Sequence, residues 1–536
     1  MFKLKGKIYL LVFIYWLILE YVLEGVFHFF SLYRFYNIVE NLLFTAFVIF
    51  IISQINNNTL KRNLYGLFII FVACMFWFET IMYLNFKIHF GPSSFFVFLN
   101  TNPDELTEFV KEYSNTRLVI VTILFLMPLL KLKSIVNCVF DFGFKYQLKR
   151  KKILKTGIIA ILFLTVFKFS LIVVHNLPYL ICRSLILNYK DTQYIDDFNA
   201  KIDANSVLFQ NINSSLNSTF IVVIGESVTS AHMQLYGYYR ETTPFFYNNR
   251  DSLSIYKDVI SPNTSTFHSL SKALTLGNYE DPKKVLALPI TTLFNKSGFK
   301  TFWISNHSPA FNPDSNLARV ANQAQSIFFN SKEAVMNNLK HDGELLYKID
   351  EALKDKAPNK IIFLHLIGAH FSYENRYPNE FNVFKDKPQT QFNSEMAHQK
   401  INTYDNAVKY SDFILDSVLD KIKRESTINK YLLYFSDHGE EVFQDDNFYG
   451  HLEDRPTKNT FKIPFVMWYG NQFAYPNDYV FDENRKYMTD DLWHSIAHIS
   501  GLKNLFVDST RSVFSDNFIK RKRIILESKD YETLFK

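Results

Sequence analysis

The first third of the chain alternates long apolar runs with short polar segments. Most of the five runs come close to the about 20 residues that an α-helix needs to cross a bilayer. They cover residues 8–30, 36–54, 65–86, 118–130 and 156–175. The first run is too long for a signal-peptide core and lacks a small-residue cleavage site, so we expect a retained anchor. The pattern predicts a transmembrane domain of five helices at residues 1–176.

Lysine and arginine in the short loops set the expected orientation of these helices. Basic residues precede the first run, separate the second from the third, and separate the fourth from the fifth. All three groups fall on one side of the membrane, which should be the cytoplasm. We therefore expect the N-terminus inside, and residues 87–116 and everything after residue 176 outside.

Four glutamates lie within the apolar runs, namely Glu20, Glu24, Glu40 and Glu79. Carboxylates are costly inside a bilayer, so they indicate a polar cavity or a site for a lipid headgroup. The alternative is that several of them lie near helix ends and reach the membrane surface. The sequence supports both interpretations equally.

A different pattern begins at residue 219, after a mixed stretch at 177–218 that we interpret as an interfacial helix and a linker. Short β-rich apolar runs now alternate with longer stretches of helical character. The runs are residues 220–224, 299–304, 361–366, 431–435 and 463–469. Uninterrupted apolar strands are typical of a largely parallel sheet that is buried on both faces. Residues 219–536 are predicted to form an α/β domain.

Composition narrows the chemistry of this second domain. The formal net charge is +6. Much of the excess of lysine and arginine lies beside apolar segments and forms no patch with exposed aromatic residues, which argues against nucleic-acid binding. With only three cysteines in 536 residues, neither a disulfide framework nor a cysteine-based zinc site is expected. Any metal site has to use histidine and carboxylate ligands.

Polar side chains follow four of the predicted strands, at the edge of the sheet where ligands of such domains bind. Asp437 and His438 leave one strand together and offer a carboxylate oxygen and an imidazole nitrogen, a combination that suits zinc. Glu226 adds a second carboxylate, and His370 and His451 add imidazoles. Any one of these is compatible with a turn or a packing role, but together they indicate a metal site.

A candidate nucleophile lies in the segment "ISPNTSTFHSLSKALT", residues 260–275. Thr264, Ser265 and Thr266 occupy a turn just before a helical pattern, which is also what an ordinary helix N-cap looks like. The two interpretations are compatible, because a hydroxyl at a helix N-terminus faces free N–H groups that stabilise a phosphorylated intermediate. Spacing alone does not choose among the three hydroxyls.

These motifs together resemble the phosphoethanolamine transferases of Gram-negative inner membranes. That family belongs to the alkaline phosphatase and sulfatase superfamily and includes the polymyxin-resistance enzymes. The resemblance covers nearly the whole chain, from the five apolar runs to a series of motifs in family order. The motifs are "TNPDE", "VVIGES", "LYGYYRETTP", "PNTSTFHSL", "HLIGAHFSYENRYP" and "SDHGEE".

The resemblance implies roles for particular residues. One zinc ion is held by Glu226, Thr266, Asp437 and His438. Thr266 is the nucleophile, because the family uses the second threonine of a Thr-x-Thr turn. His370 and His451 match additional active-site histidines, which bind or protonate the phosphoryl group and allow a second zinc. Contacts to the donor are implied for Asn306, Glu440, Thr101 and Glu105.

The family reaction implies the partners. Phosphatidylethanolamine is the donor, a phospho-threonine ester is the intermediate, and lipopolysaccharide is the acceptor, at lipid A or at a core sugar. The resemblance thus places a multi-pass protein, expected to be a monomer, in the inner membrane, with its α/β domain in the periplasm.

The chain also departs from the family pattern. Pro262 and Lys272 stand where well-known relatives have cysteines that form a disulfide beside the nucleophile, so packing and hydrogen bonds should hold this turn. Ala310 replaces a lysine of some relatives, and Val97 replaces an asparagine, which makes the donor contacts less secure than the metal ligands.

Three alternatives to this function remain from the sequence. A phosphoglycerol transferase of the lipoteichoic acid or periplasmic glucan type shares the spans, the metal fold and the threonine, but the "GES" and "LYGYYRETTP" wording argues against it. A membrane-tethered sulfatase or phosphatase releases its product to water, and "NTSTFHS" lacks the Cys/Ser-x-Pro-x-Arg motif of sulfatases. A scaffold without activity would not need the complete metal set.

Overall fold

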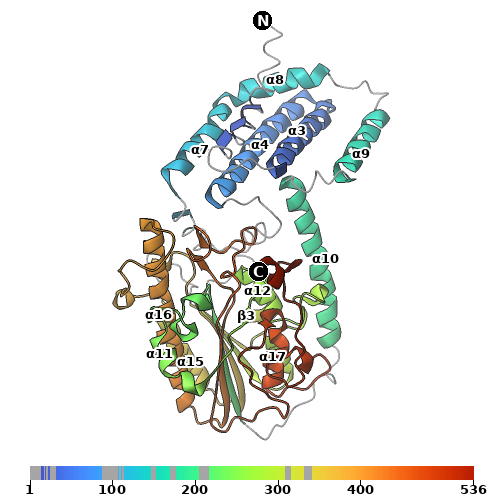
Figure 1. Cartoon of the computed structure of the whole chain (residues 1–536). Helices are drawn as coiled ribbons and strands as arrows, with labels where there is room; N and C mark the ends of the chain where they lie inside the picture. The colour runs from blue at the N-terminus through green and yellow to red at the C-terminus, as the bar shows by residue number, and fades with distance from the viewer. Residues whose placement is uncertain are drawn as a thin grey trace. The chain divides into compact units, whose positions relative to one another are not determined.

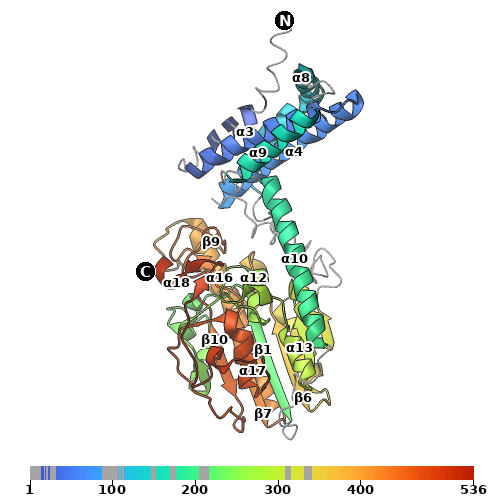
Figure 2. The same cartoon turned by 90° about the vertical axis from the view of Figure 1, so that its right-hand side faces the viewer.

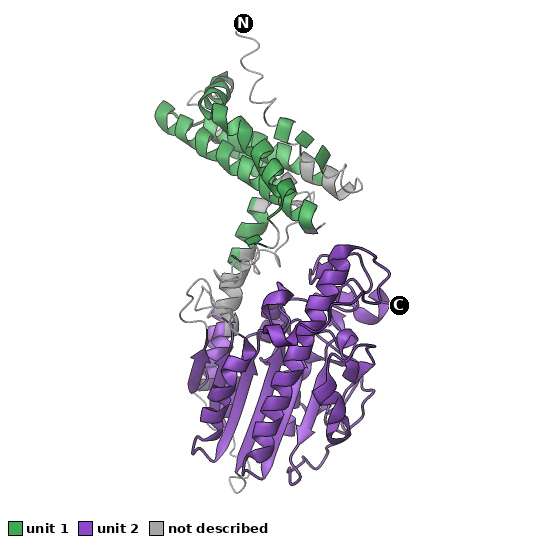
Figure 3. Cartoon of the chain, turned by 90° about the vertical axis from the view of Figure 1, so that its left-hand side faces the viewer, with its two compact units in different colours: residues 1–96, 109–189 green, residues 97–108, 190–536 purple. Residues whose placement is uncertain are grey.

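The structure is a computed structural model, and apart from isolated positions at 12–23 and 107–111 it describes residues 32–86, 114–145, 153–169, 177–203, 217–307, 316–330 and 341–536. Contacts divide the chain into two compact units, residues 1–96 with 109–189 and residues 97–108 with 190–536 (Figure 3). Some predicted features lie outside the described residues: most of the first span, Glu20, Glu24, Val97, Thr101, Glu105 and Ala310.

The first unit is helical (Figure 1). Its described helices include α3 (Leu32–Ser53), α4 (Asn58–Phe86), α7 (Thr116–Leu126), η1 (Met127–Lys131), α8 (Leu132–Lys145) and α9 (Ile153–Phe169). Buried side chains of α4, such as Ile69, Val72 and Phe76, belong to an apolar core shared with α3, α7 and α8. Among the described residues, two stretches are long and apolar enough to cross a membrane, Asn58–Asn85 and Thr116–Asp141. A helical, apolar first unit is confirmed, with two clear spans where five were predicted.

The helix that contains the fourth predicted span is longer than expected. The prediction ended the span at residue 130 and placed the next 25 or so residues in a basic loop, whereas α7 continues through η1 into α8. Pro128 lies in the first turn of η1. Proline has no N–H to donate to the carbonyl four residues earlier, and the helix changes from α to 3-10 geometry at this point. Lys131 and Lys133 therefore lie on helical turns.

Two of the glutamates in the apolar runs are buried between helices. Glu40 of α3 is 0% exposed and Glu79 of α4 is 6% exposed. Asn41 Nδ2 donates a hydrogen bond of 3.5 Å to Glu79 Oε2. Their burial argues against the interpretation that Glu40 and Glu79 reach the membrane surface, and the polar cavity or lipid-headgroup site stays a prediction.

The second unit is built on a seven-stranded sheet of order β2-β10-β7-β1-β6-β4-β5 (Figure 2). The strands are β1 (Ser218–Gly225), β2 (Leu253–Ile255), β4 (Lys300–Ser305), β5 (Ser326–Phe329), β6 (Asn359–His365), β7 (Asn429–Ser436) and β10 (Phe465–Tyr469). The central strand β1 pairs in parallel with β6 and β7, whereas β10 runs antiparallel to β7. All five predicted strands are present, and the α/β class is confirmed.

Helices cover both faces of this sheet (Figures 1 and 2). Phe220, Val222 and Ile224 of β1 face one core, and Ile221 and Val223 face the other. The first core includes side chains of α10 (Leu177–Asp203), α12 (Thr266–Ala273), α13 (Ile290–Lys296), α14 (Asn316–Ala321) and α17 (Leu492–Ile499). The second includes side chains of α11 (Pro244–Asn248), α15 (Leu346–Leu353) and α16 (Glu395–Arg424). Burial on both faces explains why the strands carry no polar alternation.

Short elements surround the sheet. They are β3 (Val259–Ile260), β8 (Glu441–Val442), β9 (Tyr449–Gly450), β11 (Tyr487–Met488), β12 (Ile524–Ile525), β13 (Lys529–Asp530) and α18 (Tyr531–Leu534). β12 and β13 form an antiparallel hairpin near the C-terminus.

The "LYGYYRETTP" motif docks on α16. Asp405, which is 0% exposed, accepts hydrogen bonds from Arg240 (2.7 Å) and Tyr238 (3.0 Å) and lies 2.6 Å from His232 Nδ1. The motif thus fixes the segment after β1 to the longest helix of the second unit.

Asp405→Asn should destabilise the protein by about 3 kcal/mol, because it leaves the buried Arg240 guanidinium with only the exposed Asp386 as an anionic partner. Urea unfolding followed by fluorescence measures the change. Asp420→Asn, which removes the partner of the exposed Arg424, is the matched control and should cost less than about 1 kcal/mol. Equal losses for the two variants would contradict the docking role of Asp405.

Candidate functional site

The candidate site begins where β1 and β7 end. These strands are parallel neighbours with Gly225 opposite Ser436, so the residues that follow them, Glu226 and Asp437, emerge side by side. Gly225 has no room for a side chain, since a Cβ there would lie 2.9 Å from the ring of Tyr434. The sheet therefore places two carboxylates next to each other at a buried edge.

Four predicted residues meet at this point. Thr266 Oγ1 donates a hydrogen bond of 2.9 Å to Glu226 Oε2 and lies 3.4 Å from His438 Nε2. His438 Nε2 is 3.5 Å from Glu226 Oε1 and 3.3 Å from Asp437 Oδ2. Glu226, Asp437 and His438 are at most 1% exposed. The structure thus brings together the four residues that the resemblance assigned to zinc.

The donor set fits a metal ion. Asp437 Oδ1 accepts hydrogen bonds from the backbone N–H groups of Ser227 and His438, whereas its Oδ2 is buried and has no hydrogen-bond partner. His438 Nδ1 lies 2.9 Å from the carbonyl of Gly439, which directs Nε2 toward the carboxylates. Two carboxylate oxygens, an imidazole nitrogen and a hydroxyl are therefore presented to one point.

The charges of this cluster also favour a cation. Burial, together with the charge of Glu226, raises the pKa of Asp437 well above its ordinary value. Burial disfavours ionised Glu226 as well, but the hydrogen bond and charge of His438 hold the pKa of Glu226 well below its ordinary value. Burial opposes a charge on His438, yet Asp437 and Glu226 raise its pKa to about 10. Two carboxyl groups and an imidazole are thus buried together in one small site, an arrangement that suits a divalent cation.

The structure distinguishes the three candidate hydroxyls. α12 begins at Thr266, whose Oγ1 contacts Glu226. Ser265 is the N-cap residue but makes no capping hydrogen bond; its Oγ lies 2.8 Å from His268 Nδ1. Thr264 Oγ1 is buried with no hydrogen-bond partner. Among these three, only Thr266 combines the helix N-terminus with the candidate metal ligands.

Two further histidines border the cluster. The ring of His451 lies 4.2 Å from that of His438, and His451 Nδ1 is 2.6 Å from Glu440 Oε2. Glu440 is 0% exposed and also accepts a hydrogen bond from Tyr373, so its carboxylate holds His451 in place. His370 is buried with a free Nδ1, and burial lowers its pKa well below the ordinary value.

Asn306, which was predicted to contact the donor, makes hydrogen bonds that link two loops. Its Nδ2 donates to Asp342 Oδ1 over 2.8 Å, and its Oδ1 accepts from Asn330 over 2.8 Å. Asp342 in turn accepts from the backbone N–H groups of Ile367 and Gly368. Asn306 thus connects the ends of β4 and β6 around the site.

Sequence reasoning missed His307 and His365, which end the same two strands. His307 Nε2 lies 4.0 Å from Glu226 Oε2, but it donates to the carbonyl of Leu366 over 2.8 Å. The rings of His307 and His365 stack 4.1 Å apart at 11°. Parallel rings cannot direct two nitrogen lone pairs at one ion, so we interpret this pair as packing. The rule that found Glu226 after a strand also applies to His307, whereas His365 lies inside the predicted run 361–366.

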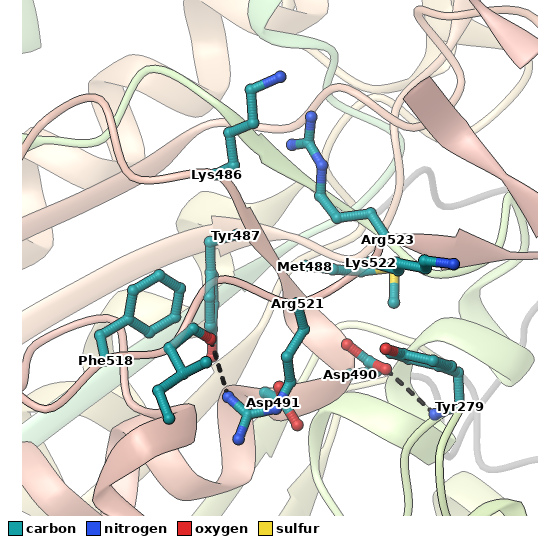
Figure 4. A pocket seen from close by; sticks show the side chains of 11 residues that line it. Tyr279, Lys486, Tyr487, Met488, Asp490, Asp491, Phe518, Arg521, Lys522 and Arg523 are labelled. Atoms are coloured by element: carbon teal, nitrogen blue, oxygen red, sulfur yellow. Dashed lines mark hydrogen bonds between the residues drawn. The ribbon is translucent and has the colours of Figure 1, made fainter. Parts of the chain in front are cut away.

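A separate pocket is lined by residues that include Tyr279, Asp490 and Arg521 (Figure 4). Asp490 accepts a hydrogen bond from the backbone N–H of Tyr279 across this pocket. None of the four candidate metal ligands lines it. Its arginines already pair with neighbouring acids, as Arg523 does with Asp258.

The fold and the site define a class. The chain belongs to the sulfatase family, whose model matches residues 218–502, more than half of the chain.

Two curated relatives indicate a narrower class of protein within this family. The phosphoethanolamine transferase EptC of Escherichia coli K12 is 31% identical over 353 residues, which cover 63% of this chain and 61% of EptC. The phosphoethanolamine transferase CptA of Salmonella typhimurium is 31% identical over 329 residues, 59% of this chain and 56% of CptA.

The chain thus spans about three fifths of the length of the curated relatives it matches. Two solved structures are also similar. The zinc complex of the C-terminal periplasmic domain of E. coli EptC aligns with 61% of this chain and 95% of that domain, at 31% identity and a TM-score of 0.57. The integral membrane phosphoethanolamine transferase EptA of Neisseria meningitidis aligns with 95% of this chain and 97% of its own, at 19% identity and a TM-score of 0.66. The second likeness concerns the fold alone.

Proposed function

We propose that this protein is a membrane-anchored phosphoethanolamine transferase. It moves phosphoethanolamine from phosphatidylethanolamine to lipopolysaccharide, at lipid A or at a core sugar, through a covalent intermediate on Thr266. The observation that carries the proposal is the 2.9 Å contact between Thr266 Oγ1 and Glu226 at the N-terminus of α12, beside Asp437 and His438. The relatives EptC and CptA, which are named phosphoethanolamine transferases, supply the identity of the transferred group.

Zinc is the proposed metal, held by Glu226, Thr266, Asp437 and His438. When bound, zinc supplies Lewis acidity, which lowers the pKa of a coordinated hydroxyl and polarises a phosphate oxygen. His370 and His451 are proposed to bind the phosphoryl group, to carry protons, or to hold a second zinc.

The chain's own residues account for two half-reactions. In the first, Thr266 Oγ1 bonds to phosphorus, its proton passes toward Glu226, and the bond to the diacylglycerol oxygen breaks. His370 or His451 protonates that leaving oxygen. In the second, an acceptor hydroxyl gives its proton to that histidine and attacks phosphorus, and the bond between phosphorus and Thr266 Oγ1 breaks as Thr266 takes back the proton held near Glu226. An ionised phosphate acceptor attacks phosphorus without losing a proton. The free N–H groups at the start of α12 stabilise the phosphoryl oxygens.

The membrane part completes the proposal. Residues 1–176 form five spans with the N-terminus inside, residues 177–218 form an interfacial helix and linker, and residues 219–536 form the periplasmic domain of a monomer. Such spans would hold the acyl chains of a lipid donor, and Thr101 and Glu105 are proposed to contact the donor. This arrangement is supported by the two clear apolar stretches among the described helices.

The test is the mass of the covalent intermediate. Full-length protein incubated with phosphatidylethanolamine vesicles and digested should yield a Thr266 peptide heavier by one phosphoethanolamine group. Donor hydrolysis without an adduct would contradict the covalent mechanism. A phosphoglycerol adduct, formed when phosphatidylglycerol vesicles are offered, would identify a phosphoglycerol transferase instead.

A further inference from the structure

Lys272, near the end of α12, is a buried lysine with two polar partners. It is 4% exposed, and a buried ammonium group is costly unless it is paired. Its Nζ donates to Asn263 Oδ1 over 2.8 Å and to Glu527 Oε1 over 2.5 Å. The lysine therefore connects the turn before Thr266 with a segment near the C-terminus.

Asn263 makes hydrogen bonds that extend this connection to residues on both sides of the turn. Its Nδ2 donates to Glu453 Oε1 over 3.0 Å, and its carbonyl accepts hydrogen bonds from Ser261 and Ser269. Glu453 Oε1 also accepts a hydrogen bond of 3.2 Å from Ser265 Oγ. Residues on both sides of Thr266 are thus fixed by one network. We call Lys272, Asn263, Glu453 and Glu527 the turn clamp.

The C-terminal hairpin contacts this turn. The N–H of Leu526 donates to the carbonyl of Pro262 over 3.1 Å. Leu526 and Glu527 adopt φ values of +49° and +66°, a backbone region that is strained for residues other than glycine. Neighbouring Ile525 is 0% exposed and packs with Phe461 in a small apolar cluster. Such strain persists where the surroundings impose it, here at the contact with the nucleophile turn.

We propose that Lys272 is a positioning residue for Thr266: through Asn263 and Glu527 it holds the nucleophile turn by hydrogen bonds and charge. Pro262 and Lys272 supply no cysteine pair, and the turn clamp takes the place of a covalent link. This inference rests on the proposed function, because it takes Thr266 as the nucleophile. Loss of the clamp lets Thr266 Oγ1 drift from Glu226 while the donor contacts stay intact.

The test compares variants of full-length protein in phosphatidylethanolamine vesicles. Lys272→Met keeps the volume of the side chain and removes its charge. We expect the rate of adduct formation on Thr266 to fall about 10- to 100-fold, because an error of about 1 Å in positioning costs that much. KM for the donor should stay within about twofold of the wild-type value.

Lys272→Arg should recover part of the rate, and Glu527→Gln should show a smaller loss of the rate of adduct formation. Lys284→Met, at a half-exposed lysine paired with Asp281, is the control.

A second readout does not depend on activity. Hydrogen exchange of peptides covering residues 261–270 should become faster in Lys272→Met and stay unchanged in Lys284→Met. Unchanged exchange, or an adduct rate like that of the wild type, overturns the inference. A loss of donor affinity in step with the rate, without recovery in Lys272→Arg, also overturns it in favour of a general folding role. If the wild type forms no adduct, the proposed function fails, and the exchange measurement still decides the role of Lys272.

Discussion

Thr266→Ala should lower phosphoethanolamine transfer by about 10³-fold or more, the scale seen when a covalent nucleophile is removed. The physical reason is that Thr266 Oγ1, 2.9 Å from Glu226, is the hydroxyl of its turn that contacts the candidate metal ligands. Transfer from a fluorescent phosphatidylethanolamine to lipopolysaccharide, separated by chromatography, measures the effect. The mass adduct on this peptide should disappear with it.

The neighbouring threonine provides the matched control. Thr264→Ala removes a buried hydroxyl that has no hydrogen-bond partner, so transfer should stay within a few-fold of the wild type. Thr266→Ser keeps a hydroxyl and should retain measurable adduct. An active Thr266→Ala protein beside an inactive Thr264→Ala protein would assign the nucleophile to Thr264.

Loss of the metal should be the second large effect. Asp437→Asn removes one negative charge from the buried set, and we expect it to abolish zinc binding and to lower transfer by about 10²- to 10³-fold, since the metal contributes several kcal/mol to charge stabilisation. Zinc content by mass spectrometry, measured on monodisperse protein, reports binding separately from activity. A chelator should reproduce the loss in the wild type, and added zinc should restore transfer there but not in Asp437→Asn.

The control for this variant comes from the same motif. Glu441 is buried like Asp437, and one of its oxygens likewise accepts two backbone N–H hydrogen bonds, but it belongs to no group of side chains, among the described residues, that could hold a metal ion. Glu441→Gln should therefore keep zinc and at least a tenth of the transfer rate. Full zinc content in Asp437→Asn would exclude that carboxylate as a ligand.

The strand ends were predictable because they follow from a general rule. Apolar runs without alternation indicate a parallel sheet, and the carboxyl ends of such strands carry the ligands, which leads to Glu226, Asp437 and His438. The choice of Thr266 over Thr264 and Ser265 was not predictable from spacing, because it depends on where α12 begins and on which way its first side chain points.

Other features of the structure could not be predicted from the residues next to them in the sequence. Lys272 reads as a helix surface residue, and its partner Glu527 is 255 positions away. A lysine in an apolar helix is informative only when its partner is known. The segment after residue 130 was predicted to be a loop because it is rich in basic residues. It contains an amphipathic helix, α8, that continues from α7 through η1. His307, in contrast, follows a predicted strand and needed only a consistent use of the same rule, whereas His365 lies inside a predicted apolar run.

The distance along the chain between Lys272 and Glu527 also has a consequence for biosynthesis. Ribosomes add about 5–20 residues per second, so on the order of 10–50 s separate the synthesis of the two residues. During that interval the ligands Asp437 and His438 are made, while the turn that carries Thr266 still lacks its contact with the C-terminal hairpin. If the turn clamp positions Thr266 as proposed, a nascent chain reaches its full rate only after the C-terminal hairpin has folded.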